Sequence, residues 1–204
     1  MPQIALMLQL QQQLNDATNG KRWEDGVTKQ GKPIDWRRCI YLECAELIES
    51  YPWKHWKNID AQADTENIKI EVVDIWHFVM SEVLRLHKGD FDTLAQEIKT
   101  VPNFQNLKSL PKPISNDYFA QIETIERFIK SVFDDNSWRE MIQRYFEVVI
   151  QSGLNLESLY QLYVGKNILN QFRQDNGYKD GSYIKVWDGQ EDNVVMQNLL
   201  ANNT

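Results

Sequence analysis

Two apolar segments of this chain are each interrupted by a pair of acidic residues. Residues 39–49 read CIYLECAELIE and residues 70–80 read IEVVDIWHFVM, so apolar side chains surround both pairs. The pairs are Glu43 with Glu46, and Glu71 with Asp74. Acids three residues apart share one face of an α-helix, and a helix that is apolar nearly all round is normally buried. The sequence therefore predicts two buried helices, each with an acidic face.

Buried acidic pairs indicate a metal site. A buried carboxylate costs several kcal/mol unless it is paired or bound to a cation, and Lys69 is the only basic residue near the acids within the second helix. A single pair of this kind is usually a solvated face. Two pairs on adjacent helices favour a site for oxygen-preferring cations such as Mg²⁺ or Mn²⁺. Glu49, three residues after Glu46, is either an outer ligand or an exposed acid.

His77 follows Asp74 by three residues and raises a redox-metal alternative. Di-iron carboxylate bundles take a Glu-x-x-His motif from each of two helices and a Glu from each of two more. His55 follows a Pro-Trp pair and His87 lies at a helix end, so neither completes a second motif. We therefore expect His77 to form a pocket wall or to be a hydrogen-bonded core histidine.

Helical spacing of apolar residues continues along almost the whole chain and predicts an all-α fold. The alternation from Tyr183 to Trp187 is too short to build a sheet, so we expect a helical bundle with little or no sheet. Ser115, Ser137 and Asn155 are the expected first residues of three helices, and Ser137 with Glu140 forms a capping-box motif. The expected helices cover residues 4–18, 36–50, 64–86, 91–99, 115–133, 137–151, 155–173 and 191–200.

The length and composition fit one domain over residues 1–204. A chain of 204 residues can bury a sizeable core, and residues 101–116, which contain three prolines and little periodicity, are the expected connection between two halves. The formal net charge of −7 argues against broad binding to nucleic acid or to an anionic membrane. No uncharged apolar run approaches the roughly 20 residues that cross a bilayer, and no signal-peptide pattern opens the chain. Two cysteines, Cys39 and Cys44, give neither a zinc half-site nor a disulfide framework, so we expect reduced thiols in a cytoplasmic protein.

A cationic region near the C-terminus could bind phosphates. Lys166, Asn170 and Arg173 follow one another at helical spacing. The loop beyond them, made flexible by two glycines, adds hydroxyls and cations at Tyr178, Lys179, Tyr183 and Lys185. Such groups suit phosphate oxygens, although a solvated helix end whose cations favour the helix dipole would have the same spacing.

Near the N-terminus, Gln12 and Asn15 share a helix face. A primary amide offers a donor and an acceptor together, which is what the edge of a uracil requires. Trp53 and Trp56, after the first acidic helix, are available for stacking on a base. Neither feature is specific by itself.

Four segments together resemble the dimeric, all-α dUTPase family, which is related to the wider all-α nucleoside triphosphate pyrophosphatases. The acidic motifs alone indicate only the wider group, whereas the acidic motifs together with the C-terminal block FRQDNGYKDG are specific to the dimeric dUTPases. The resemblance covers most of the chain, and residues 89–136 are its least diagnostic part. The segments are LQLQQQLND (8–16), ECAELIESYPWKHWK (43–57), NIKIEVVDIWHF (67–78) and GKNILNQFRQDNGYKDGSY (165–183).

The resemblance implies a function and a homodimer. It implies hydrolysis of dUTP to dUMP and pyrophosphate, with dUDP also accepted, which keeps uracil out of DNA and supplies dUMP. Glu46 is the expected group that positions and deprotonates the attacking water. The implied ligands of more than one Mg²⁺ ion are Glu43, Glu46, Glu71 and Asp74.

The resemblance also assigns substrate contacts. It gives Gln12 and Asn15 as the amides that read uracil, with Trp56 and neighbouring rings around the base. Phe78, beside His77, would pack on the deoxyribose where a 2′-hydroxyl would clash, and Asn170 would lie near the sugar. His55 stands where some relatives carry Trp, so the stacking over the base could differ. The implied phosphate-binding residues are Lys166, Arg173, Tyr178, Lys179 and Lys185.

Two other functions fit parts of the pattern. A sister pyrophosphatase acting on dCTP or on a damaged nucleotide would keep the four acids but would not need the Gln12–Asn15 pair. A noncatalytic helical protein that stores a structural cation would also keep the acids. This last alternative leaves the cationic loop over residues 173–185 unexplained.

Overall fold

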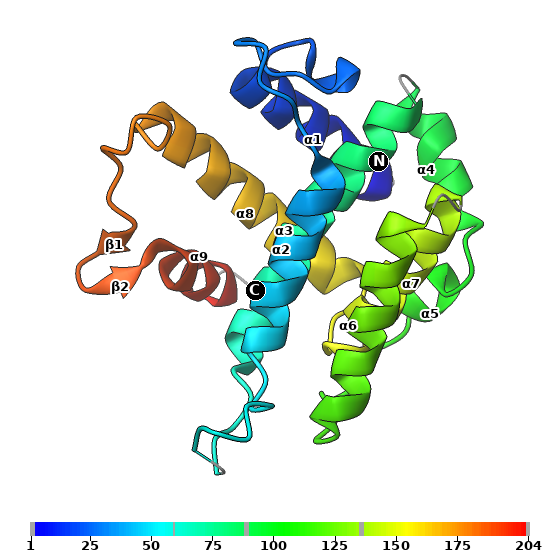
Figure 1. The fold of residues 1–204 in the computed structure, drawn as a ribbon, viewed down its shortest axis with the longest axis vertical. Helices are drawn as coiled ribbons and strands as arrows, with labels where there is room; N and C mark the ends of the chain where they lie inside the picture. The colour runs from blue at the N-terminus through cyan, green and yellow to red at the C-terminus, as the bar shows by residue number, and fades with distance from the viewer. Residues whose placement is uncertain (1–2, 59, 88–89, 135–136, 203–204) are drawn as a thin grey trace.

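Helices α2 and α3 form the centre of the fold (Figure 1). The computed structural model describes residues 3–58, 60–87, 90–134 and 137–202. Within it, α2 covers Trp36–Glu49 and α3 covers Thr65–His87, and the two helices pack along one another. The Asp35 side chain caps α2 by accepting a hydrogen bond from the backbone N–H of Arg38. Both acidic segments are therefore helical, as the spacing predicts.

The other helices lie on two sides of this central pair. Helices α1 and α8 pack together and both contact α3, whereas α6 contacts α2 and pairs with α7. Helix α9 packs on α8, and Gly165 of α8 allows a close approach, because a Cβ there would lie 2.8 Å from Leu200 Cδ1. The bounds are α1 Gln3–Asn19, α4 Phe91–Lys99, α5 Phe104–Leu107, α6 Tyr118–Phe133, α7 Trp138–Gln151, α8 Leu156–Asp175, α9 Asp192–Ala201 and the 3₁₀ helix η1 Trp23–Asp25.

The strand content of the described residues is one short hairpin, so the all-α prediction is confirmed. Strand β1, Val186–Trp187, pairs antiparallel with β2, Gln190–Glu191. Asp188 and Gly189 join them with φ values of 49° and 83°, which a two-residue turn of type I′ requires. In the part of the chain that the structure describes, no helix has the length and apolar character needed to cross a bilayer.

Three local expectations differ from the structure. Helix α6 is capped by Asp117 and not by Ser115, whose Oγ accepts from the Asp117 backbone N–H. The expected connection over residues 101–116 contains the short helix α5, because Phe104 and Leu107 are buried. The Ser137 side chain caps α7 by accepting from the backbone N–H of Arg139. A capping box would use the backbone N–H of the next residue, Glu140. The observed capping box is at Asn155.

One large apolar cluster contains residues from both sides of the 101–116 connection. At its centre the Trp76 ring of α3 stacks on Tyr145 of α7, with ring centroids 4.9 Å apart. The Tyr145 hydroxyl donates to the Val72 carbonyl oxygen at 2.9 Å, fully buried. This contact fixes α3 against α7. The acids of α3 that are candidate metal ligands, Glu71 and Asp74, line a cavity on the other side of α3. The division into two halves stays a prediction.

Removal of the buried Tyr145 hydroxyl should lower stability without disturbing the stacked ring. We expect Tyr145→Phe to lower the free energy of unfolding by about 1 kcal/mol, because a satisfied buried hydrogen bond contributes about that much. Tyr41→Phe is the control, since the Tyr41 side chain is exposed and its change should stay within about 0.5 kcal/mol. Urea unfolding followed by circular dichroism measures both. Equal effects in the two variants would contradict the assignment.

Candidate active site

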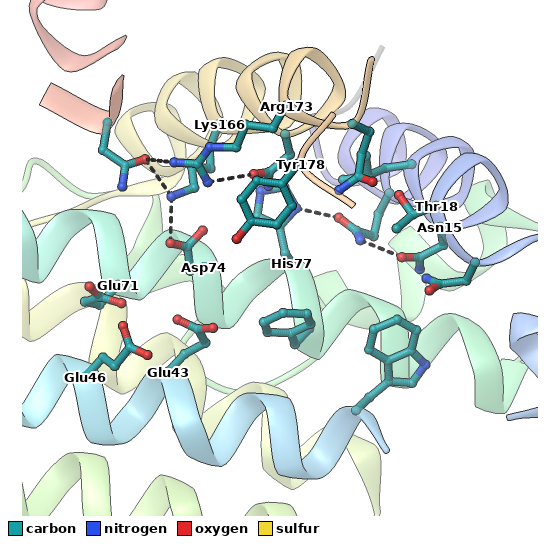
Figure 2. A pocket seen from close by; sticks show the side chains of 18 of the residues that line it. Asn15, Thr18, Glu43, Glu46, Glu71, Asp74, His77, Lys166, Arg173 and Tyr178 are labelled. Carbon is teal, nitrogen blue, oxygen red and sulfur yellow. Dashed lines mark hydrogen bonds and ion pairs between the residues drawn. The ribbon is translucent and has the colours of Figure 1, made fainter. Parts of the chain in front are cut away.

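A cavity of about 460 Å³ lies among helices α1, α2, α3 and α8 and the segment that follows α8 (Figure 2). It brings together residues that are far apart in the sequence. Twelve of the predicted site residues line it: Asn15, Glu43, Glu46, Glu71, Asp74, His77, Phe78, Lys166, Asn170, Arg173, Tyr178 and Lys185. Gln12, Trp56 and Lys179 are not among its lining residues.

The acidic wall of the cavity is formed where α2 packs on α3. Figure 2 shows Glu43 and Glu46 from α2 facing Glu71 from α3. One carboxylate oxygen of each lies within 4.8 Å of the other two. Glu71 Oε2 is buried and has no hydrogen-bond partner within the described residues. Three converging carboxylates, one with an unsatisfied oxygen, fit an oxygen-preferring divalent cation. The cluster contains no histidine, which does not favour the di-iron alternative.

Burial and mutual repulsion raise the pKa values of these acids. The pKa of Glu43 rises to about 8, first through burial and then through the charges of Asp74, Glu71 and Glu46. The pKa of Glu71 rises to about 7, again through burial first and then through Asp74 and Glu46. Their ionised forms are therefore disfavoured until positive charge arrives. Glu49, in contrast, is half exposed and pairs with Lys54 outside this cluster. Of the two alternatives for Glu49, an outer ligand or an exposed acid, the structure shows the exposed acid.

Asp74 lies in the same cavity, but its carboxylate turns away from the other three. It accepts a hydrogen bond from Lys166 Nζ at 2.7 Å (Figure 2). Lys166 comes from α8, is only 2% exposed, and also donates to Asn193 Oδ1 at 2.8 Å. The sequence indicated Lys69 as the nearest cation, yet Lys69 pairs with Glu66 at the start of α3. The cation that pairs with Asp74 is therefore Lys166, which lies 92 residues further along the chain.

Arg173 is held by an acid that the sequence analysis missed. Its Nε and Nη2 donate to the two carboxylate oxygens of Asp192 at 2.9 and 2.7 Å, and both side chains are buried. Nη1 has one long contact, 3.4 Å, with Asn170 Oδ1. The two bonds to Asp192 thus fix the position of the Arg173 guanidinium, and Arg173 also lines the cavity. An acid in the first turn of a helix is ordinary at the sequence level, so the sequence gives little signal for this partner.

The loop after α8 contributes to the cavity two of the three loop residues that the resemblance assigns to phosphate binding. Tyr178 and Lys185 line it, and Lys185 Nζ lies 5.5 Å from the centre of the Tyr178 ring. Lys179 instead donates to the backbone oxygen of Thr18 at 2.9 Å. The loop therefore lies against the end of α1. The side opposite the acids carries cations and hydroxyls that suit phosphate oxygens.

At the other end of the cavity, Gln11 takes the place that was predicted for Gln12. Gln11 is buried, lines the cavity and donates to Asn15 Oδ1 at 3.1 Å. Gln12 Nε2 donates to Glu24 Oε1 at 2.9 Å and so ties α1 to η1. Gln11 and Asn15 are one full turn apart on α1. The run of three glutamines in the sequence does not show which of them faces inward.

A different tryptophan from the one predicted faces the cavity. Trp56 is 61% exposed and contacts Trp53 and His55. Trp36, the first residue of α2, lines the cavity and stacks on Phe78 with centroids 5.9 Å apart. The sequence shows Trp36 only as a helix start, so its stacking depends on how α2 meets α3. Trp36 and Phe78 provide an aromatic wall next to the amides.

His77 forms the wall of the pocket, as one of the two expectations states. It is 4% exposed, and its Nδ1 lies 2.7 Å from Gln11 Oε1. Burial first, and then the charge of Lys166, lower its pKa to about 3, so the ring is neutral at physiological pH. Its Nε2 is buried without a hydrogen-bond partner among the described residues.

Comparison with known proteins identifies the family. A family model described as dUTPase matches residues 3–178, which include the four acids, the amides of α1 and the cations of α8. A comparison with curated proteins gave no match. The matched range covers most of the chain and the four long helices α1, α2, α3 and α8 that line the cavity, whereas the lining residues Lys185 and Asn193 lie beyond it. The chain therefore belongs to the all-α dUTPase family and is a dUTP diphosphatase.

Proposed function

We propose that this dUTPase works with Mg²⁺ bound between α2 and α3 and with the triphosphate lying between the acidic and cationic walls. The observation that carries the proposal is the convergence of Glu43, Glu46 and Glu71 opposite Lys166 and Arg173 in one cavity. The product pair would be dUMP and pyrophosphate. On the strength of the resemblance we also propose that dUDP is a substrate, that the protein acts as a homodimer and that it works in the cytoplasm.

Glu43, Glu46 and Glu71 would hold the cation, with Mn²⁺ able to replace Mg²⁺. Asp74 would join them after its carboxylate exchanges Lys166 for the ion, and a second ion would share the same acids. When bound, such ions lower the pKa of a ligated water and neutralise charge on the phosphates. The raised pKa values of Glu43 and Glu71 support this proposal, because a bound cation offsets the burial and the repulsion that cause them.

Glu46 is the proposed base for the attacking water. Of the three converging acids it is the one with an exposed side chain, so water and substrate reach it. A carboxylate in this place would orient the water and take its proton as the water oxygen bonds to phosphorus and the P–O bond between the α- and β-phosphates breaks. Lys166 and Arg173 would neutralise the charge that develops on the phosphates, together with Tyr178 and Lys185. Phe78 would pack on the deoxyribose, with Asn170 near the sugar.

Substrate selectivity and metal dependence form the first prediction. Phosphate and pyrophosphate release from dUTP and dUDP should require Mg²⁺ and stop with EDTA, while dTTP, dCTP and UTP stay nearly inert. The reason is that the carboxylate cluster must bind the metal and its triphosphate, the amide end must bind the base, and Phe78 must pack on a sugar without a 2′-hydroxyl. Turnover of dCTP or dTTP at the rate of dUTP would contradict the uracil site, and full activity in EDTA would contradict the metal site.

The Glu46→Gln variant should fold normally but lose activity by about 100-fold or more. The amide keeps the size of the side chain, but it neither holds a cation well nor accepts the proton of water. Glu49→Gln is the matched control on the same helix, because Glu49 pairs with Lys54 outside the cluster, and it should keep near-normal kcat. Steady-state kinetics and thermal unfolding of both variants test this assignment. Normal kcat in Glu46→Gln would remove Glu46 from this role.

The raised pKa values predict that Mg²⁺ binding strengthens with pH. In the metal-free protein Glu43 and Glu71 lose their protons at about pH 8 and about pH 7, and a protonated carboxyl is a poor ligand. In the unfolded chain these acids ionise near their ordinary value of 4.5. The metal-free protein should therefore lose stability as the pH rises from about 4.5 to about 8, and Mg²⁺ should restore it.

Thermal unfolding at about pH 6 and about pH 8.5, with and without Mg²⁺, measures this effect. The Mg²⁺-induced increase in Tm should be larger at the higher pH. An increase that is equal at both pH values, or larger at the lower one, would contradict the assignment of Glu43 and Glu71 as ligands.

A further inference from the structure

Ser81 lies at the centre of a buried polar cluster at the base end of the cavity. It belongs to α3, one turn after His77, and its side chain is fully buried. Its Oγ donates to the His77 carbonyl oxygen at 2.8 Å. The same Oγ accepts from Gln11 Nε2 at 3.1 Å and from Asn15 Nδ2 at 3.0 Å. Two of the cavity-lining amides of α1, those of Gln11 and Asn15, are therefore bonded to one hydroxyl.

This arrangement fixes which end of each amide faces which neighbour. A serine hydroxyl has one proton and two lone pairs. The proton of Ser81 is used by the His77 carbonyl, so only lone pairs remain for the amides of Gln11 and Asn15. A flipped Asn15 would place its Oδ1 against Ser81 Oγ, where no proton is available. A buried acceptor left in this state costs about 1–3 kcal/mol.

The remaining contacts of Gln11 agree with this orientation. Because Gln11 Nε2 faces Ser81 and Asn15, its Oε1 faces His77 Nδ1 at 2.7 Å. The Tyr163 hydroxyl lies 3.2 Å from the same oxygen. His77 Nδ1 therefore carries the proton and donates it to Gln11. A flip of Gln11 would break the bonds to Asn15 and Ser81 together.

The orientation of the Asn15 amide decides which base it can read. With one Nδ2 proton on Ser81, Asn15 keeps a second N–H and one lone pair of Oδ1 for the cavity. That donor and acceptor match O4 and N3–H of uracil. Cytosine presents the reverse order, an amino donor beside an N3 acceptor. The flipped amide would therefore suit cytosine, so discrimination needs an amide that does not flip.

We propose that Ser81 is a positioning residue for base selection, which locks Asn15 in the orientation that accepts uracil and rejects cytosine. This inference rests on the proposed reading of the base by Asn15. It requires no contact between Ser81 and the substrate. The hydroxyl acts only through the two amides, and its effect is therefore on selectivity more than on the rate with dUTP.

The Ser81→Ala variant tests the proposal. We expect its ratio of kcat/KM for dUTP to kcat/KM for dCTP to fall by about tenfold or more, because the amides lose the acceptor that orients them. Ser131→Ala is the matched control, since Ser131 is also buried and donates to a helix carbonyl, that of Phe128, at 2.7 Å. It lies on α6, away from the cavity, and should leave the ratio unchanged. Thermal unfolding of both variants measures their loss of stability.

The Ser81→Thr variant keeps the hydroxyl and should keep the ratio of the wild type, which separates orientation from packing. If the Ser81→Ala variant does not fold, Ser81→Cys replaces it in the comparison. The thiol is a weak acceptor, so Ser81→Cys should lower the ratio whereas Ser81→Thr should not. An unchanged ratio in the variants without a hydroxyl would overturn the proposal while dUTP hydrolysis stands. A wild-type enzyme that turns over dCTP as fast as dUTP would overturn the reading of uracil itself.

Discussion

The repulsion between carboxylates held at the contact of α2 and α3 is the constraint on which the site depends. Apolar packing along these helices places oxygens of Glu43, Glu46 and Glu71 within 4.8 Å of one another, and the raised pKa values report the cost. The packing of the core, including the stack of Trp76 on Tyr145, maintains this arrangement. The fold thus holds together carboxylates that would separate in an unfolded chain. The resulting cluster favours the binding of a cation.

The cationic side of the cavity is organised by ion pairs within the protein. Lys166 is bonded to Asp74, and Arg173 to Asp192. The first pair joins the two walls, so the proposed cation and triphosphate would replace it by binding Asp74 and Lys166 separately. The second pair lies behind the cavity and is nearly dry, so breaking it would be costly. Arg173 is therefore a fixed cation, whereas Lys166 would exchange partners on binding the proposed ligands.

Helix α3 connects the acidic end of the cavity to the end that we propose recognises the base. Glu71, Asp74, His77 and Ser81 follow one another at intervals of three or four residues along one side of the helix. The first two belong to the acidic wall and the last two to the buried amide cluster. The charged end depends on repulsion that a ligand relieves, while the other end is neutral and its Gln11 and Asn15 amides are already hydrogen-bonded within the protein. One rigid helix can therefore set the distance between the reacting phosphate and the base.

The sequence by itself determined the helices and the identity of the acids, because both follow from local spacing. Apolar periodicity placed α2 and α3 within a residue or two of their observed bounds, and acids inside apolar runs marked Glu43, Glu46, Glu71 and Asp74. The resemblance added the identification as an all-α dUTPase, which the family match confirms.

Only the tertiary structure decided which neighbours these side chains meet. Gln11 in place of Gln12, and Trp36 in place of Trp56, depend on the rotation of a helix against its neighbours. The pairing of Lys166 with Asp74 joins residues 92 positions apart. Spacing along a chain fixes which residues share a helix face. It does not fix what that face contacts, because packing between distant segments sets the contact.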